Sequence, residues 1–319
     1  MKFLLTVLTL TILSLNNFTS AASTMTTSNA DLQKAYDDIQ KTLGVVPTFI
    51  KSFPTAGLPA AWEEMKSIQL SSSTVLPARL KELIGLAVAS QIPCHYCVYL
   101  HTEAAKVNGA SEDEIKEAVG MAALTRHWGT YVGGVQMTEA DAAKDVDKMM
   151  AHMRAELTKP IKDASSSSSE QEKAMQPIAV IDSESAYKDM EQTLGSVPTL
   201  LRMFPENGIA SAWKMMKAVE LNPETELSAK AKELISLGVA SQMSCPQCTY
   251  YSTEAAKVNG ANTSELREAI AMASVTRLWS TVLNGSQADE KTFKREVGQI
   301  MRHTKTQAKK VGMTAITKQ

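Results

Sequence analysis

Cysteine is scarce in this 319-residue sequence, and its few positions are concentrated. All four cysteines lie in two Cys-x-x-Cys pairs, Cys94 with Cys97 and Cys245 with Cys248. A scaffold held together by disulfides would spread its cysteines to close long loops, because the stabilisation grows with the length of the closed loop. These pairs would close only very short loops and contribute little stability. Their spacing therefore argues for redox or metal chemistry.

The sequence also has no excess of either charge and only one long apolar run. A net charge of -1 gives no electrostatic reason to expect nucleic acid or an anionic membrane as a partner. The apolar run extends from Phe3 to Leu15, follows a single lysine and precedes the small residues of 19–23. This order is typical of a secretory signal peptide, with cleavage expected after Ala21 or Ala22. The alternative is an N-terminal anchor helix, although the run is short for a bilayer.

Export would change the chemistry of the cysteines, because thiols outside the cytosol form disulfides by default. We therefore expect a periplasmic or secreted protein without stable membrane insertion. An inert, structural disulfide remains an alternative for each pair.

An internal repeat governs the organisation of the chain. The segment AYDDIQKTLGVVPTFIKSFP, which starts at Ala35, matches AYKDMEQTLGSVPTLLRMFP, which starts at Ala186, at an offset of 151 residues and without a gap. Residues 81–109 and 232–260 are identical at 20 of 29 positions. Between the copies lies a serine-rich, charged segment that is typical of a flexible linker. We therefore divide the chain into a signal peptide (1–22), a first domain (23–157), a linker (158–182) and a second domain (183–319).

Sustained alternation of apolar and polar residues, the pattern of strands, is absent from the sequence. Helical periodicity predicts an all-α fold of two similar helical bundles. Gly44 is placed to end the first helix. Ser111 with Glu114 predicts a capping box at the start of a later helix, and Asn262 with Glu265 repeats it in the second copy. The predicted helices of the first copy span residues 22–44, 58–70, 76–91, 94–109, 111–129 and 141–156.

Cys94, Cys97 and His101 stand at positions i, i+3 and i+7, so they share one face of a helix. A thiol in the first turn of a helix is held near the positive end of the helix dipole, which favours the thiolate. His101 is placed one turn beyond Cys97, where it can accept the thiol proton. Glu82 lies on the preceding helix, and its carboxylate can face His101 if the two helices form a hairpin. We expect these residues to form one relay of nucleophile, base and orienting carboxylate.

The pattern E-x11-C-x2-C-x3-H, formed by Glu82, Cys94, Cys97 and His101, resembles the motif of the alkylhydroperoxidase D family, in the carboxymuconolactone decarboxylase-like superfamily. The resemblance implies that Cys97 attacks a hydroperoxide and that Cys94 resolves the sulfenic acid to a disulfide. It also implies that His101 deprotonates Cys97 with the assistance of Glu82. His95 departs from the family pattern, and we expect it to be accessory or exposed.

The resemblance further implies oligomers, because relatives assemble as trimers or hexamers. The family's prototype takes electrons from a cytosolic lipoyl-bearing partner, which an exported protein cannot use, so the dithiol donor is not identified. No flavin, haem or nucleotide motif is visible, and we expect the cysteines themselves to be the redox centre, without a cofactor.

The second copy keeps Glu233, Cys245 and Cys248 at the same spacing but has Ser252 in place of the histidine. A serine cannot act as a base at neutral pH. We therefore expect a degenerate site that still forms a disulfide and is vestigial, structural or a relay of electrons to the first site. Pro246 suits the first turn of a helix, so the helix itself should persist.

Three alternatives remain open at this stage. The four motif residues are legitimate ligands for zinc or another metal. The superfamily's decarboxylase activity needs no Cys-x-x-Cys, so the pair counts against it. The third alternative is a secreted, non-enzymatic scaffold with both pairs locked as disulfides. His152 and His303 match between the copies, and their charged surroundings predict that both lie on the solvent-exposed surface.

Overall fold

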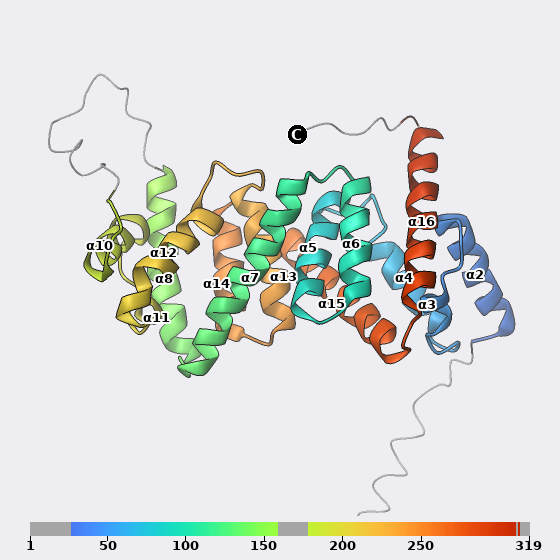
Figure 1. Ribbon diagram of the computed structural model, residues 1–319, viewed down its shortest axis with the longest axis horizontal. Coiled ribbons are helices and arrows are strands. Elements are labelled where there is room, and N and C mark those ends of the chain that lie inside the picture. The colour runs from blue at the N-terminus through green and yellow to red at the C-terminus, as the bar shows by residue number, and fades with distance from the viewer. Residues whose placement is uncertain (1–26, 159–177, 311, 313–319) are drawn as a thin grey trace, which may run out of the picture.

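The computed structural model describes residues 27–158, 178–310 and 312, and every regular element in that part of the chain is helical (Figure 1). The prediction of an all-α fold is confirmed. The first copy contributes α2 (Asn29–Leu43), α3 (Thr48–Lys51), α4 (Leu58–Ile68), α5 (Ala78–Gln91), α6 (His95–Val107), α7 (Glu112–Gly134) and α8 (Glu139–Thr158). The second copy contributes α10 (Ser183–Leu194), α11 (Thr199–Arg202), α12 (Glu206–Met216), the π-helical turn η1 (Lys217–Leu221), α13 (Ala229–Gln242), α14 (Pro246–Val258), α15 (Thr263–Gly285) and α16 (Glu290–Lys310).

The helix ends follow local signals in the sequence. Ser111 and Glu114 exchange both bonds of a capping box at the start of α7, and Asn262 with Glu265 does the same for α15. Gly44 ends α2 in the left-handed conformation, at a φ of 79°, which glycine adopts without steric cost. These expected boundaries are therefore confirmed.

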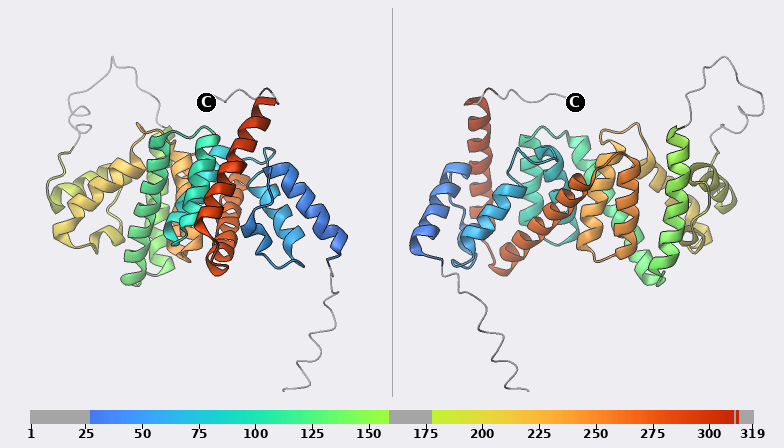
Figure 2. Two further views of the ribbon diagram at one scale, coloured as in Figure 1. Left: turned by 45° about the vertical axis from the view of Figure 1, so that its right-hand side comes forward. Right: turned by 180° about the vertical axis from the view of Figure 1, so that it is seen from behind.

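The two copies are interleaved around one continuous core. Helices α5, α7, α13 and α15 occupy the middle of the molecule, and each contacts members of the other copy. The last helix of each copy then crosses over, so that α16 packs on α2, α3 and α6, whereas α8 packs on α10, α11 and α14. In Figure 2, α16 accordingly stands among the first helices of the first copy. The largest buried apolar cluster contains residues of both copies.

Reciprocal polar contacts hold the crossed helices in place. Glu296 on α16 accepts hydrogen bonds from the backbone nitrogen of Thr48, at 2.9 Å, and from its hydroxyl, at 2.6 Å. At the matching positions, Asp145 on α8 accepts a hydrogen bond from the backbone nitrogen of Thr199 at 2.5 Å. Each short helix α3 or α11 therefore receives its N-terminal cap from the other copy.

The prediction of solvent-exposed histidines at 152 and 303 is wrong. His303 packs over Gly44, where a Cβ atom would lie 2.6 Å from the imidazole ring, and His152 packs over Gly195 in the same way, at 2.5 Å. Both side chains are half-buried. The charged neighbours in the sequence line the outer faces of α8 and α16, but the histidines face the crossed copy.

Some predictions fall outside the part of the chain that the structure describes. These are the signal peptide at 1–22 and most of the linker at 158–182. Within residues 27–158 and 178–310, no helix has the length and apolar character needed to cross a bilayer.

Candidate active site and its altered copy

The first site is built on the hairpin of α5 and α6 and is completed by α15 of the second copy. His101 Nδ1 lies 2.7 Å from Glu82 Oε2, so the expected pairing of these side chains is present. On the other side of the ring, His101 Nε2 lies 3.4 Å from the hydroxyl of Thr276. Both His101 and Glu82 are buried. The imidazole is thus fixed between a carboxylate and a hydroxyl that come from different copies.

Two further residues make room for this pair and orient it. Gln69 donates its side-chain amide to both oxygens of Glu82, at 3.1 and 3.3 Å. Gly85 leaves space for the ring, since a Cβ atom there would lie 2.5 Å from His101. Sequence reasoning missed both residues, as well as Thr276. A position-by-position comparison of the two copies would have marked Gln69 and Gly85, because the other copy differs at both.

The two cysteines of the first site lie at the N-terminus of α6. Cys94 is the N-cap residue and Cys97 lies in the first turn, with their Cα atoms 5.4 Å apart and their sulfurs joined in a disulfide. The Cys94 sulfur accepts a hydrogen bond from the Cys97 backbone nitrogen at 3.2 Å. That donor, together with the helix dipole, would stabilise a thiolate on Cys94 after reduction. His95 on the same helix is exposed, as expected.

An aromatic cluster lies against α6 in the first copy. The rings of Phe293 and Tyr96 meet edge to face with centroids 5.2 Å apart, and Phe293 in turn contacts Phe49 at 5.6 Å. The Tyr96 hydroxyl donates a 2.6 Å hydrogen bond to the carbonyl of Ala288. Only 1% of Cys94 and 2% of Cys97 is exposed. The site that carries the complete motif is therefore sealed from solvent in this conformation.

The second site replaces the imidazole by a chain of hydroxyl groups. Ser252 stands at the position of His101, and its hydroxyl lies 2.9 Å from that of Ser236. Ser236 occupies the position of Gly85, in the space that the imidazole ring fills in the first copy, and lies 2.9 Å from the hydroxyl of Thr125 on α7. All three side chains are buried. Ser236 therefore occupies the space left by the missing ring and forms hydrogen bonds with its neighbours there.

The second site also contains a pair of buried carboxyl groups. Glu220 stands where the first copy has Gln69, and it shares a side-chain hydrogen bond with Glu233. The Tyr251 hydroxyl donates to Glu220 Oε1 at 2.6 Å. Burial, then the charge of Glu220 and the hydrogen bond to it, raise the pKa of the Glu233 carboxyl well above its usual range. Burial also raises the pKa of Glu220, against the lowering effect of its hydrogen bonds. Both shifts favour a proton shared by the pair, because two adjacent buried carboxylates resist ionising together.

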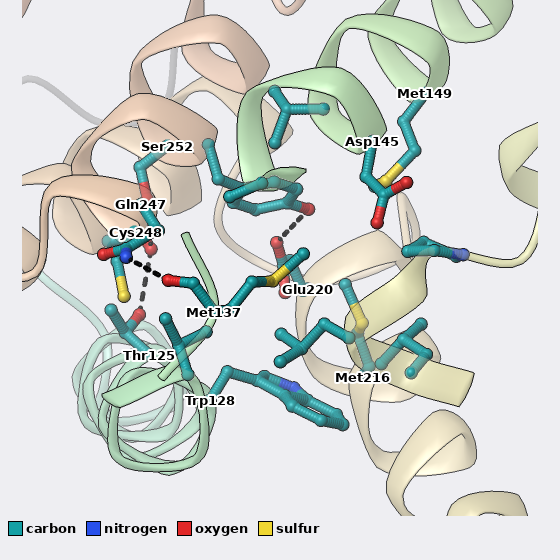
Figure 3. Close-up of a pocket in the computed structure, with 18 residues that line it drawn as sticks. Thr125, Trp128, Met137, Asp145, Met149, Met216, Glu220, Gln247, Cys248 and Ser252 are labelled. Atoms are coloured by element: carbon teal, nitrogen blue, oxygen red, sulfur yellow. Dashed lines mark hydrogen bonds between the residues drawn. The ribbon is translucent and has the colours of Figure 1, made fainter. Parts of the chain in front are cut away.

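Beside these groups lies a cavity of about 120 Å³, between α7, α8, α12 and α14 (Figure 3). Smaller residues open it: Ala142 stands where the first copy's site has Phe293, Leu200 where it has Phe49, and Gln247 where it has Tyr96. Cys248 lines the cavity and forms a disulfide with Cys245, and each of these cysteines is 9% exposed. The copy that lacks the histidine is thus the more open of the two.

Comparison with known proteins agrees with the repeat and the helical hairpins. The family model named "Carboxymuconolactone decarboxylase family" matches the chain twice, at residues 56–140 and 208–291, which together form more than half of it. The chain belongs to the carboxymuconolactone decarboxylase family. The two matches also establish it as a tandem duplication. Each match includes the Cys-x-x-Cys hairpin of its copy.

One solved structure is similar to this member of the family. It is a protein from Burkholderia xenovorans named as a gamma-carboxymuconolactone decarboxylase subunit, with 15% sequence identity and a TM-score of 0.49. The similarity covers 87% of this chain and 98% of that one. None of the curated proteins compared with this chain matches it.

The donor groups of the two sites bear on the metal alternative. In the part of the chain that the structure describes, no group of three or more His, Cys, Asp or Glu side chains is arranged so that it could bind a metal ion. In the first site, Gln69 and Thr276 take up the neighbouring polar positions around Glu82 and His101. The structure thus brings Glu82 and His101 into contact and joins Cys94 to Cys97, and His101 stands about one helical turn beyond Cys97 on α6.

Proposed function

We propose that the first copy is a thiol-dependent oxidoreductase that reduces hydroperoxides, or protein disulfides, through Cys97 and Cys94. The observation that carries the proposal is the 2.7 Å contact between His101 and Glu82, on the hairpin that also presents the disulfide. A carboxylate that orients an imidazole is part of the arrangement that activates nucleophilic cysteines, and His101 stands about one helical turn from Cys97 on α6.

The catalytic cycle begins with reduction of the Cys94–Cys97 disulfide by a dithiol donor, which becomes a disulfide itself. His101 then takes the proton of Cys97, and the thiolate attacks the terminal oxygen of the hydroperoxide. The O–O bond breaks, Cys97 becomes a sulfenic acid, and the leaving alkoxide takes the proton from His101 to give an alcohol. Cys94 attacks the sulfenic sulfur, which releases water and restores the disulfide. Overall, one hydroperoxide and two thiols give one alcohol, one water and one disulfide.

The aromatic cluster sets a condition on this cycle. Because Cys94 and Cys97 are buried, donor and substrate reach them only after a local opening. We place that opening at Tyr96 and Phe293, whose counterparts Gln247 and Ala142 line the cavity beside Cys248 in the second site. The same burial favours the alternative in which the pair is a locked, structural disulfide of a non-enzymatic protein. The family name supplies a further alternative, carboxymuconolactone-type decarboxylation, for which the cysteines would be unnecessary.

The proposal extends to location and assembly. The N-terminal segment supports export to the periplasm or the outside of the cell, where the dithiol donor would be a protein of that compartment. The proposal includes a homo-oligomer, and Val119 on α7 and Ile270 on α15, which stand at matching positions and are 39% and 37% exposed, are candidates for its contact surface.

The test is consumption of tert-butyl hydroperoxide by the mature protein with dithiothreitol as the donor. We expect Cys97→Ser to abolish turnover and His101→Ala to lower it by about 10²-fold or more, the usual contribution of a general base. His95→Ala, an exposed position on the same helix, is the control and should keep full turnover. If the wild type shows no turnover although its disulfides are reduced, the peroxidase proposal is wrong. Turnover that survives Cys97→Ser would exclude the first site as its source.

The variant Cys248→Ser tests whether the second pair passes electrons to the first. Full turnover without Cys248 would exclude that relay and leave the first pair to act alone.

A further inference from the structure

The second site differs from the first by a matched set of changes. Relative to the first copy, an amide is replaced by a carboxyl group, an aliphatic residue by a phenol, a glycine by a serine, and the histidine by a serine. These changes are Gln69 to Glu220, Leu100 to Tyr251, Gly85 to Ser236 and His101 to Ser252. Each new group has a hydrogen-bond partner among the others or on α7. Random loss of a site would leave buried polar groups without partners, which is costly.

Glu233 is the least satisfied member of this network. Its buried Oε2 receives no hydrogen bond from an amide, hydroxyl or ammonium donor, so the carboxyl group depends on its hydrogen bond with Glu220. In the first copy, both oxygens of the matching Glu82 are satisfied by Gln69 and His101. The carboxyl pair, of which Glu220 lines the cavity, therefore has hydrogen-bonding capacity left.

The cavity has an apolar wall and a polar end. Trp128, Val146, Met149 and Leu201 belong to the wall, together with residues of α7, α8 and α12. The polar end is formed by Thr125, Ser236 and Ser252 beside the Cys248 sulfur. Glu220, bonded to Tyr251, and Asp145 add polar groups farther along the cavity, as Figure 3 shows for the labelled side chains. An apolar cavity of about 150 Å³ holds one benzene molecule in another protein, so a volume of about 120 Å³ admits a single small ring or a short alkyl chain.

We propose that this cavity is a binding site for a short apolar molecule with one neutral hydroxyl head, of the size of phenol. The ring or chain would lie against Trp128 and the methionines, and the hydroxyl would reach the serines and Glu220. A hydroxyl both donates and accepts, which matches a lining that contains both serine hydroxyls and carboxyl oxygens. An anionic head would meet the carboxyl pair and be repelled. A cationic head would gain little binding free energy from the carboxyl groups, because the ammonium group of Lys232 already interacts with both of them. This binding does not depend on redox activity in the first copy.

The test is calorimetric titration of the whole protein with phenol, benzene and benzoate. We expect the wild type to bind phenol more tightly than benzene and not to bind benzoate. Ala142→Phe places the first site's own residue in the cavity and should lower phenol affinity more than tenfold. Circular dichroism checks that this variant is folded. No binding of phenol to the wild type, or equal binding to a folded Ala142→Phe protein, would overturn the proposal.

A second variant keeps the proposal testable if Ala142→Phe does not fold. Glu220→Gln restores the residue of the first copy and leaves the cavity wall unchanged. It should lower the affinity for phenol by about three- to tenfold, the contribution of one hydrogen bond, and leave the affinity for benzene unchanged. Equal phenol binding by wild type and Glu220→Gln, or benzoate binding as tight as that of phenol, would refute the assignment of the head group.

Discussion

The substitution Phe293→Ala should open the first site and speed the reduction of its disulfide. Phe293 comes from α16 of the second copy and is almost fully buried against Phe49 and Tyr96. The second site has Ala142 at the matching position, beside a cavity of about 120 Å³. If the variant leaves a cavity of that size, the cavity term alone costs about 3 kcal/mol, and Phe→Ala substitutions in cores cost about 3–5 kcal/mol in total.

In the wild type, a fluctuation that moves the Phe293 ring out of the core leaves a similar cavity and therefore costs a similar free energy, about 3 kcal/mol. Access to Cys94 and Cys97 should then be about 10²-fold slower in the wild type than in the variant, since each 1.4 kcal/mol is a factor of ten. The assay is the rate at which dithiothreitol reduces each disulfide, followed by thiol alkylation and mass spectrometry of the two cysteine peptides. In the wild type, the Cys245–Cys248 disulfide should be reduced first.

Ile209→Ala is the matched control, because Ile209 is buried in a separate apolar cluster, most of whose residues belong to the second copy. It should lower stability by a similar amount without changing the rate at Cys94–Cys97. If Phe293→Ala is folded and its first disulfide is reduced no faster than in the wild type, then the aromatic cluster does not control access. If Ile209→Ala accelerates the reaction equally, global destabilisation explains the effect and the reasoning fails.

Three further predictions concern the relay, the carboxyl pair and the crossed helices. Once the first disulfide is reduced, His101→Ala should raise the apparent pKa of the Cys97 thiol, measured by the pH dependence of alkylation; an unchanged profile would exclude contact between the two groups. The pKa of Glu233 is higher in the folded state than in the unfolded one, so the folded protein binds more protons above pH 4.5 and its stability should fall as the pH rises toward the raised pKa. Glu233→Gln should make that fall in the free energy of unfolding, measured with urea at several pH values, less steep; identical slopes would contradict a shared proton. Gly44→Ala and Gly195→Ala should each cost about 1–3 kcal/mol, because the backbone is left-handed and the facing histidine occupies the space; urea midpoints equal to that of the wild type would show that the contact is not tight.

Much of this arrangement follows from local sequence. The spacing of Cys94, Cys97 and His101 fixes their common helical face, and a short connection to the preceding helix brings Glu82 to His101. Caps such as Ser111 with Glu114 are equally local. These features depend on residues within a few turns of one another, where helical geometry leaves little freedom.

The remaining features depend on contacts between the copies, which periodicity does not reveal. Thr276 reaches His101 across 175 positions of the chain, and Phe293 reaches Tyr96 only because α16 crosses over. The orientation of His303 was mispredicted for the same reason, since nothing near it in the sequence identifies Gly44 as its neighbour. The one accessible signal was the difference between aligned positions, such as Gln69 and Glu220.

The crossing of α8 and α16 has a consequence for how sequence changes act on this protein. Phe293 belongs to the second copy and packs on Tyr96 at the first site, whereas Ala142 belongs to the first copy and lines the cavity of the second. In a symmetric dimer of identical chains, any such substitution would alter both sites at once. Because duplication gives each site its own copy of every position, one site can be closed around a histidine while the other is opened around a carboxyl pair.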